Sequence, residues 1–404
     1  MTLSDELTWR GFVNQTTYDD IKVLDGEPIS FYLGVDPSAD SMTIGNLATC
    51  MLVRHFIDHG HKAYLLVGGA TGMIGDPDGK KDERNLKSIE EIEKNKAAIA
   101  EQYRRIFDGK PFELVDNYEW FCDMNYITFL RDVGKHVPLS TMLGRDFVQA
   151  RLGEGGSGIS YAEFSYSLIQ GYDFLHLYRK YGVTLQVCGA DQWGNSVTGV
   201  QLIRRIENGE AHVFSAPLIV NKTTGVKFGK TEEGAVWLDS NKTSVYKFYQ
   251  FWLNVDDEGA IDYAKIYTLL PRERIEELAQ KQQANPGARD VQKALAFEVT
   301  KLVHGEIAAE SARRVTSVLF GGTEFASLSH GDVELLAKEI PVASVGFMVV
   351  DLLASSGLAA SKGEARRLIN GGAISVNGQK ITEDVAIEQP SLVKKGKNTF
   401  LLVR

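Results

Sequence analysis

The chain has 404 residues, of which 44% are apolar and 24% charged, and its formal net charge is −9. This length predicts two or three domains, and the apolar fraction excludes a wholly disordered chain. No segment approaches the length of uninterrupted apolar sequence that a membrane span needs, and the polar residues 1–10 lack the apolar core of a secretory signal. Cys50, Cys122 and Cys188 are odd in number and widely separated, which argues against a disulfide framework or a zinc site. We therefore expect a cytoplasmic protein with no membrane segment.

The charge is unevenly distributed along the chain. Residues 341–404 contain 8 Lys+Arg and 5 Asp+Glu, a net charge of +3, whereas the remainder carries −12. A basic end on an acidic body indicates a polyanion bound at that end. A chance fluctuation in a small domain explains the same numbers equally well, so charge alone leaves both interpretations open.

The most informative stretch covers residues 29–56. Its apolar run over 29–35 predicts a buried strand, the Asp36-Pro37 step predicts a turn, and apolar residues at 44, 47, 48, 51, 52 and 56 predict a helix. A strand–turn–helix unit directs free backbone N–H groups and the positive end of the helix toward one point, which favours phosphate binding. Many α/β proteins use the same unit only as a connection.

Further strands are predicted over 62–67, 112–115, 183–187 and 213–220, with a helix over 88–107. This alternation predicts an α/β domain with a parallel sheet, in which ligands bind beyond the carboxyl ends of the strands. A glycine-rich segment over 68–75 follows the second strand. Its four glycines require either positive φ angles or a close approach of the backbone to another group.

A polar face is predicted on a helix around residues 164–175. Tyr166, Gln170 and Asp173 are spaced by four and three residues, so they share one face of that helix. Its apolar neighbours indicate that the helix is otherwise buried, and buried polar groups need partners. A carboxylate at Asp173, opposite Tyr32, would accept a hydrogen bond from a phenol. An exposed polar stripe is the alternative.

Together these stretches resemble the tyrosyl-tRNA synthetases, a class I aminoacyl-tRNA synthetase family, over essentially the full length of the chain. The first class I signature, His-Ile-Gly-His in that family, reads Thr43-Ile44-Gly45-Asn46 here. The second signature reads Lys227-Phe228-Gly229-Lys230-Thr231, where two lysines supply mobile charges for a pyrophosphate leaving group. Both histidine positions differ: Asn46 retains an amide donor, and Thr43 offers a hydroxyl on a shorter arm.

The resemblance implies an α/β fold with four regions. These are a Rossmann-like parallel-sheet catalytic domain over 1–220, the second signature with an α-helical anticodon-arm domain over 221–325, a linker over 326–340 and a small α+β S4-like RNA-binding domain over 341–404. Residues 125–136 match a dimer-forming segment of the family, so a homodimer is implied.

The basic tail contains a predicted helix that fits the S4-like assignment. Ser361 with Glu364 fits a capping box that opens this helix. By resemblance Lys362, Arg366 and Arg367 would contact RNA phosphates there. A small protein-docking module is the alternative.

The resemblance also implies L-tyrosine, ATP accompanied by Mg²⁺, and tRNA(Tyr) as partners, with no structural metal. The implied tyrosine-binding residues, of which the first two hold the substrate hydroxyl, are Tyr32, Asp173, Asp76, Tyr166, Gln170, Gln186 and Gln192. The implied ATP-binding residues are Gly34, Asp36, Ser38, Gly45, Thr49, Gly189, Asp191, Lys227, Phe228, Gly229, Lys230 and Thr231. The implied catalytic residues are Lys227, Lys230, Thr43, Asn46, Lys80 and Arg84, although solvated surface charge also explains the last two.

Three functional interpretations remain. The first is a working tyrosine–tRNA ligase, which forms tyrosyl-adenylate and pyrophosphate and then transfers tyrosine to the 3′-terminal adenosine of tRNA(Tyr). The second is a specialised paralogue, and the third is a non-catalytic RNA-binding protein that uses the basic tail. The retained second signature favours an enzyme, because RNA binding alone does not require a loop for a phosphate leaving group.

Overall fold

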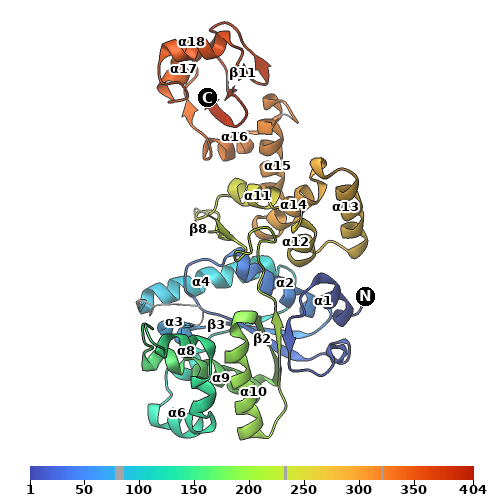
Figure 1. Ribbon diagram of the computed structural model, residues 1–404, viewed down its shortest axis with the longest axis vertical. Coiled ribbons are helices and arrows are strands. Elements are labelled where there is room, and N and C mark those ends of the chain that lie inside the picture. Colours follow the sequence, from blue (N-terminus) through green and yellow to red (C-terminus); the bar gives the residue numbers. More distant parts are fainter. Residues whose placement is uncertain (78–85, 232–233, 321) are drawn as a thin grey trace. The chain divides into compact units, whose positions relative to one another are not determined.

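The computed structural model describes residues 1–77, 86–231, 234–320 and 322–404 (Figure 1). The chain forms two compact units: residues 1–243 with 255–295, and residues 244–254 with 296–404. None of the described helices is long and apolar enough to cross a membrane.

The first unit is built on a mainly parallel sheet, as the strand and helix pattern predicts. The strand order is β1-β6-β5-β2-β3-β4, and only β1 runs antiparallel, paired with β6. Strand β6 ends earlier than predicted, because Pro217 has no N–H to continue the ladder. The strand bounds are β1 (Gln15–Thr16), β2 (Ser30–Val35), β3 (Lys62–Val67), β4 (Glu113–Val115), β5 (Val183–Gly189) and β6 (His212–Ala216).

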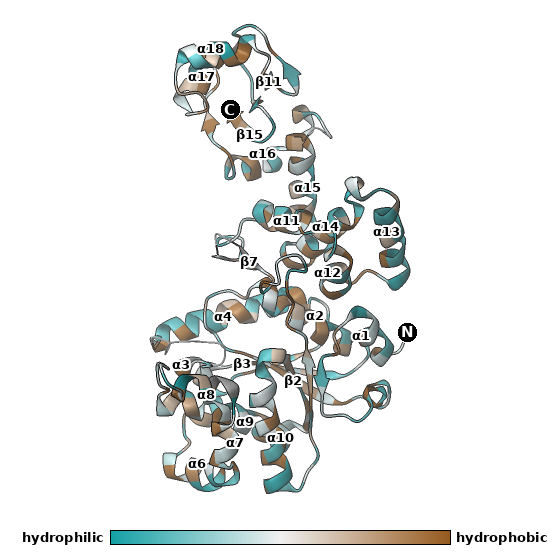
Figure 2. Ribbon diagram, viewed as in Figure 1, coloured by the Kyte–Doolittle hydropathy of each residue, from teal (hydrophilic) through white to brown (hydrophobic). Residues whose placement is uncertain are grey.

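Helices cover both faces of this sheet. Figure 1 shows α2 and α4 over one face and α9 and α10 over the other. Figure 2 shows α2 as a largely hydrophobic helix, and most of its residues are buried. The helices of this unit up to α10 are α1 (Leu3–Arg10), α2 (Ile44–Asp58), α3 (Gly69–Ile74), α4 (Ile89–Ile106), α5 (Tyr118–Phe121), α6 (Tyr126–Asp132), α7 (Leu139–Leu143), α8 (Asp146–Leu152), α9 (Tyr161–Tyr181) and α10 (Trp193–Glu207).

Glycines let the elements around the sheet approach closely. A Cβ on Gly199 of α10 would lie 2.7 Å from the Cβ of Phe174 on α9, so only glycine fits between these two helices. In the predicted glycine-rich segment, a Cβ on Gly72 would lie 2.8 Å from Cγ of Pro37, whereas Gly75 has φ +83. Both predicted reasons for the glycines therefore apply. The close approach of Gly72 to Pro37 packs the glycine-rich segment against the turn that follows β2.

The remaining secondary structure lies mostly after residue 217. The short strands β7 (Lys230–Thr231) and β8 (Gly234–Ala235) pair antiparallel. The helices are α11 (Val245–Leu253), α12 (Ala260–Tyr267), α13 (Arg272–Ala284), α14 (Asp290–His304), α15 (Glu306–Phe320), α16 (His330–Ala337), α17 (Val349–Ser355) and α18 (Lys362–Asn370).

The C-terminal part of the second unit combines α17 and α18 with a small sheet. Its strand order is β12-β11-β14-β15-β9, and β10 pairs separately with β13. Apolar residues of both helices and of the sheet form one core. The strand bounds are β9 (Val342–Ala343), β10 (Phe347–Met348), β11 (Ile374–Val376), β12 (Gln379–Lys380), β13 (Ala386–Ile387), β14 (Ser391–Lys395) and β15 (Thr399–Val403).

The structure differs from the prediction at residues 326–340, which were expected to form a linker. They contain α16, whose buried Leu336 belongs to the same apolar cluster as Val315 of α15. Asp332 of α16 accepts hydrogen bonds from Arg314 at 2.8 and 2.9 Å. A helix this short offers few periodic apolar positions, so the sequence gives no clear helical pattern there.

Candidate active site

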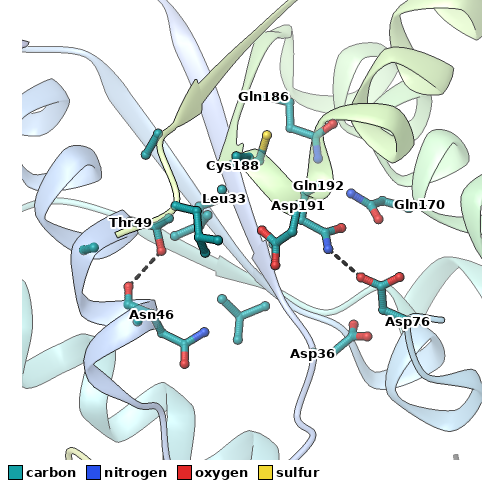
Figure 3. A pocket seen from close by; sticks show the side chains of 18 of the residues that line it. Leu33, Asp36, Asn46, Thr49, Asp76, Gln170, Gln186, Cys188, Asp191 and Gln192 are labelled. Carbon is teal, nitrogen blue, oxygen red and sulfur yellow. Dashed lines mark hydrogen bonds between the residues drawn. The ribbon is translucent and has the colours of Figure 1, made fainter. Parts of the chain in front are cut away.

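A cavity of about 320 Å³ opens at the carboxyl edge of the parallel sheet. Strands β2 and β5, helices α2 and α9 and the segments 216–219 and 227–228 contribute to its wall (Figure 3). The structure thereby brings together most of the predicted tyrosine-binding and ATP-binding residues. Those that line the cavity are Tyr32, Gly34, Asp36, Ser38, Thr43, Gly45, Asn46, Thr49, Asp76, Tyr166, Gln170, Asp173, Gln186, Gly189, Asp191, Gln192, Lys227 and Phe228.

The phenol of Tyr32 and the carboxylate of Asp173 lie buried at the wall of this cavity, 1% and 2% exposed. No hydrogen bond joins the two groups. Asp173 instead accepts from Asn117 Nδ2 at 3.1 Å and from Trp120 Nε1 at 2.9 Å. The hydroxyl of Tyr32 finds no partner among the residues that the structure describes. A buried hydroxyl without a partner is costly, so this position favours a polar ligand group.

Burial also sets the protonation of this pair. It raises the pKa of Asp173 well above its usual range, although the hydrogen bonds from Asn117 and Trp120 oppose that shift. Burial likewise raises the pKa of Tyr32, and the nearby charge of Asp173 adds to the effect. The Tyr32 phenol therefore stays protonated and able to donate at neutral pH.

A second polar cluster lies beside this pair. Gln192 Nε2 donates to Asp76, and the Tyr166 hydroxyl donates to Asp36 at 2.7 Å. Figure 3 shows Asp76, Gln170 and Gln192 close together at the same side of the cavity. The buried Oε1 atom of Gln170 has no hydrogen-bond partner in the described part of the chain. Two carboxylates and an amide oxygen form an acceptor-rich wall, which suits an ammonium group.

The N-terminus of α2 forms the opposite side of the cavity. The backbone N–H and the hydroxyl of Thr43 both donate to Oδ1 of Asn46, each at 3.0 Å. Lys227 also lines the cavity and supplies a cation. The helix N-terminus, the amide and the ammonium make this side suitable for phosphate.

The second signature is joined by backbone contacts to the first. Ile44 N donates to Val236 O at 3.1 Å, and Leu238 N donates to Met42 O at 2.9 Å. Gly229 has φ +86, and a Cβ there would lie 2.5 Å from Cγ1 of Ile44. Two independent reasons therefore favour glycine at this position: the positive φ angle of its backbone and the close approach of Ile44 on α2.

Several predicted residues are not placed at the cavity. Lys230 and Thr231 form β7, and their side chains are outside what the structure describes; Lys80 and Arg84 lie outside the described residues altogether. The three predicted RNA-binding residues, Lys362, Arg366 and Arg367, are exposed on α18 in the second unit.

Sequence reasoning missed Asn117 and Trp120, the two donors that hold Asp173. Both residues lie just after β4, in a segment without a recognisable periodicity or motif. They are also far from Asp173 in the sequence, so no local pattern links them to it. Cys188 also lines the cavity without being predicted. All three cysteines are free in the structure.

Comparisons with known proteins agree with this site. The family model "tRNA synthetases class I (W and Y)" matches residues 24–321, and the model "Tyrosine--tRNA ligase SYY-like C-terminal domain" matches residues 332–404. The tyrosine–tRNA ligase of Bacillus caldotenax is 46% identical, with 100% of both chains covered. Tyrosine–tRNA ligase 2 of Bacillus cereus is 43% identical over 100% of this chain and 99% of its own length.

A solved structure gives the same result for the fold. The C-terminally truncated mitochondrial tyrosyl-tRNA synthetase of Aspergillus nidulans superposes with a TM-score of 0.71 at 28% identity, covering 79% of this chain and 94% of its own. The parallel sheet, the cavity at its carboxyl edge and the two signatures thus define a class I tRNA synthetase. Within that class, the chain belongs to the bacterial-type tyrosyl-tRNA synthetase family.

Proposed function

We propose that this chain activates L-tyrosine with ATP and transfers it to tRNA(Tyr). The observation that carries the proposal is the buried Tyr32 hydroxyl, which lacks a partner among the described residues, beside the buried carboxylate of Asp173. A phenolic hydroxyl between them would accept from Tyr32 and donate to Asp173. Phenylalanine would leave both groups unpaired, which is a strong penalty in a buried site.

The acceptor-rich wall orients the amino acid. Asp76, Tyr166 and Gln170 would hold the α-amino group, with Gln186 and Gln192 beside it. The α-carboxylate would then face the N-terminus of α2, where the phosphates of ATP would bind. Gly189 and Asp191, at the end of β5, would hold the ribose.

The first step needs positioning rather than a protein nucleophile. An oxygen of the tyrosine carboxylate attacks the α-phosphorus of ATP, and the bond to the β,γ-pyrophosphate breaks. Lys227, the α2 N-terminus and the Asn46 amide would stabilise the charge on the phosphate oxygens. Lys230, Lys80 and Arg84 are proposed for the same task on the family resemblance alone. In the second step the adenosine hydroxyl of tRNA(Tyr) takes the tyrosyl group and AMP leaves.

We propose that Mg²⁺ arrives with ATP and is bound by its phosphates. Among the described residues, no group of three or more His, Cys, Asp or Glu side chains could hold a metal ion. Mg²⁺ commonly binds through substrate phosphates with one or two protein carboxylates, so the acidic residues at the cavity suffice for this binding mode.

The S4-like assignment of the C-terminal domain and its RNA contacts also belong to the proposal. Arg366 and Arg367 are exposed on α18, and Lys362 forms an ion pair with Asp351 at 2.6 Å. Cations carried on one short helix suit the phosphate backbone of tRNA.

A cytoplasmic location remains a prediction, since aminoacylation would serve translation there.

A homodimer is proposed from the surface around α6. Tyr126 and Ile127 are 57% and 67% exposed on that helix, and Tyr161 nearby is 61% exposed. Exposed apolar residues gathered in this way mark protein interfaces.

An Ile127→Glu substitution tests this interface, and it should convert the dimer to a monomer in analytical ultracentrifugation. Ile307→Glu, at a site 87% exposed in the second unit, is the matched control and should leave the dimer intact.

The reaction is tested by ATP–pyrophosphate exchange with tyrosine, phenylalanine and tryptophan in parallel. Exchange with tyrosine alone, together with charging of tRNA(Tyr), is the expected result. A protein that binds tRNA but supports no exchange would be the non-catalytic RNA-binding alternative. That alternative is not favoured, because RNA binding needs neither the Tyr32–Asp173 pair nor the cationic loop at the cavity.

A further inference from the structure

The first lysine of the second signature has an exposed side chain, but the residue after it is anchored. Lys227 is exposed and lines the cavity, whereas Phe228 is only 6% exposed. The ring of Phe228 stacks on the ring of Tyr263 in α12, with ring centroids 4.2 Å apart and 24° between the planes. The ring of Tyr267, one turn further along α12, has its centroid 5.9 Å from that of Phe228. The backbone that carries Lys227 is therefore attached to α12 through an aromatic contact.

The hydroxyl of Tyr263 holds the segment that pairs with Lys227. Val220 forms an isolated antiparallel β-bridge with Lys227. The Tyr263 hydroxyl donates to the carbonyl oxygen of Val220 and accepts from the backbone N–H of Lys222, each at 3.3 Å. A single side chain thus holds the backbone on both sides of Lys227. Its ring contacts the residue that follows the lysine, and its hydroxyl contacts the bridge partner of the lysine.

Other side chains attach the same segment to the start of α12. Asn221 Nδ2 donates to Asp256 at 3.2 Å, and Asp256 also accepts from the backbone N–H of Gly259 at 2.6 Å. A Cβ on Gly259 would lie 2.5 Å from Cε2 of Tyr263, so glycine leaves the space that the phenol occupies. Because Asn221 provides a separate attachment, loss of the Tyr263 hydroxyl should shift this segment without unfolding it.

We propose that Tyr263 is a positioning residue for adenylate formation: through Phe228 and Val220 it places the ammonium group of Lys227 at the phosphates of ATP. The inference rests on the proposed function and deepens it. Lysine is a point charge on a flexible stem, so its effect on a transition state depends on how well the backbone beneath it is fixed. Tyr263 is not among the described residues that line the cavity, so it acts through its neighbours.

Three variants test this assignment in tyrosine-dependent ATP–pyrophosphate exchange. Tyr263→Phe keeps the stack and removes the hydroxyl, so kcat should fall about 3–10-fold. Tyr263→Leu removes the stack as well, so kcat should fall about 10–100-fold. Gly259→Ala leaves Tyr263 in place but displaces its phenol, so kcat should fall at least as far as in Tyr263→Phe. The KM for tyrosine should be unchanged in all three, and an unchanged kcat in both Tyr263 variants would overturn the proposal.

A double-mutant cycle with Lys227 separates positioning from a general loss of structure. Lys227→Met removes the ammonium group and keeps most of the length of the side chain, so kcat should fall about 10²–10³-fold. If Tyr263 acts through Lys227, adding Tyr263→Leu to Lys227→Met should slow the reaction no further. Multiplied losses would mean that Tyr263 acts by another route, and would overturn the proposal.

Tyr103→Phe is the matched control for the loss of a buried hydroxyl. The hydroxyl of Tyr103 in α4 is buried and has no hydrogen-bond partner in the part of the chain that the structure describes. Its removal should leave kcat unchanged. A fall equal to that of Tyr263→Phe would mean that losing any buried hydroxyl has this effect, and would refute a specific role for Tyr263.

The wild-type reaction keeps the two proposals distinguishable. Absence of tyrosine-dependent exchange in the wild-type protein would refute the proposed function itself. Wild-type exchange together with an unchanged kcat in both Tyr263 variants would refute only the role of Tyr263. Equilibrium binding of tyrosine should be retained in every variant, and its loss in the Tyr263 variants would indicate general disruption of the site and overturn the positioning role.

Discussion

Trp120→Phe isolates one hydrogen bond to the residue that would recognise the substrate hydroxyl. The indole Nε1 of Trp120 donates to Oδ1 of Asp173 at 2.9 Å, and phenylalanine has no N–H to replace it. The ring also stacks on His176 with centroids 4.4 Å apart, a contact that phenylalanine retains. After the change, Asn117 at 3.1 Å is the remaining side-chain donor among the described residues.

The expected effect follows from the burial of Asp173, which is 2% exposed. Losing this donor leaves a buried oxygen of Asp173 short of a partner, which costs about 1–3 kcal/mol, and leaves the carboxyl group less well placed. The KM for tyrosine in ATP–pyrophosphate exchange should therefore rise about 5–150-fold, while the KM for ATP changes little.

The matched control is Trp252→Phe, which removes a fully buried indole in the second unit. It should lower thermal stability while leaving the KM for tyrosine unchanged. An unchanged KM in Trp120→Phe would refute the reasoning, and so would an equal rise in Trp252→Phe. The second result would mean that general destabilisation, rather than the contact with Asp173, alters tyrosine binding.

Three further changes follow from particular contacts. Gly199→Ala places a Cβ 2.7 Å from that of Phe174, so the free energy of unfolding in urea should fall by about 1–3 kcal/mol; a neutral result would mean that α9 and α10 separate without cost. Burial opposes ionisation of Asp332, but hydrogen bonds from Arg314 and two serines outweigh it and lower the pKa of this carboxyl. Its stabilisation is therefore present above the unfolded pKa of about 4 and is lost as the pH falls toward the folded pKa. Asp332→Asn should cost about 2 kcal/mol at pH 7 and flatten this acid dependence in urea titrations, and an unchanged dependence would contradict the assignment. Tyr32→Phe should reduce the tyrosine-over-phenylalanine ratio of kcat/KM about tenfold, because one partner of the substrate hydroxyl is lost; an unchanged ratio would exclude that contact.

The sequence by itself determined the elements that depend on local spacing. Strand β3 begins and ends at the predicted residues, and β2 and α2 differ from their predictions by at most one or two residues. Period-two and helical patterns are local properties of the chain, so neighbouring residues are enough to specify them. The shared face of Tyr166, Gln170 and Asp173 was predictable for the same reason.

Only the tertiary structure decided which groups meet. Asn117 and Trp120 reach Asp173 across 56 and 53 residues of sequence. Their side chains come from elements that no sequence pattern relates to the helix that carries Asp173. The helix α16 was missed because its stability comes from packing on α15 and from the ion pair with Arg314 rather than from its own periodicity. Contacts between distant segments depend on how whole elements pack, and that information is not present in any single stretch of the chain.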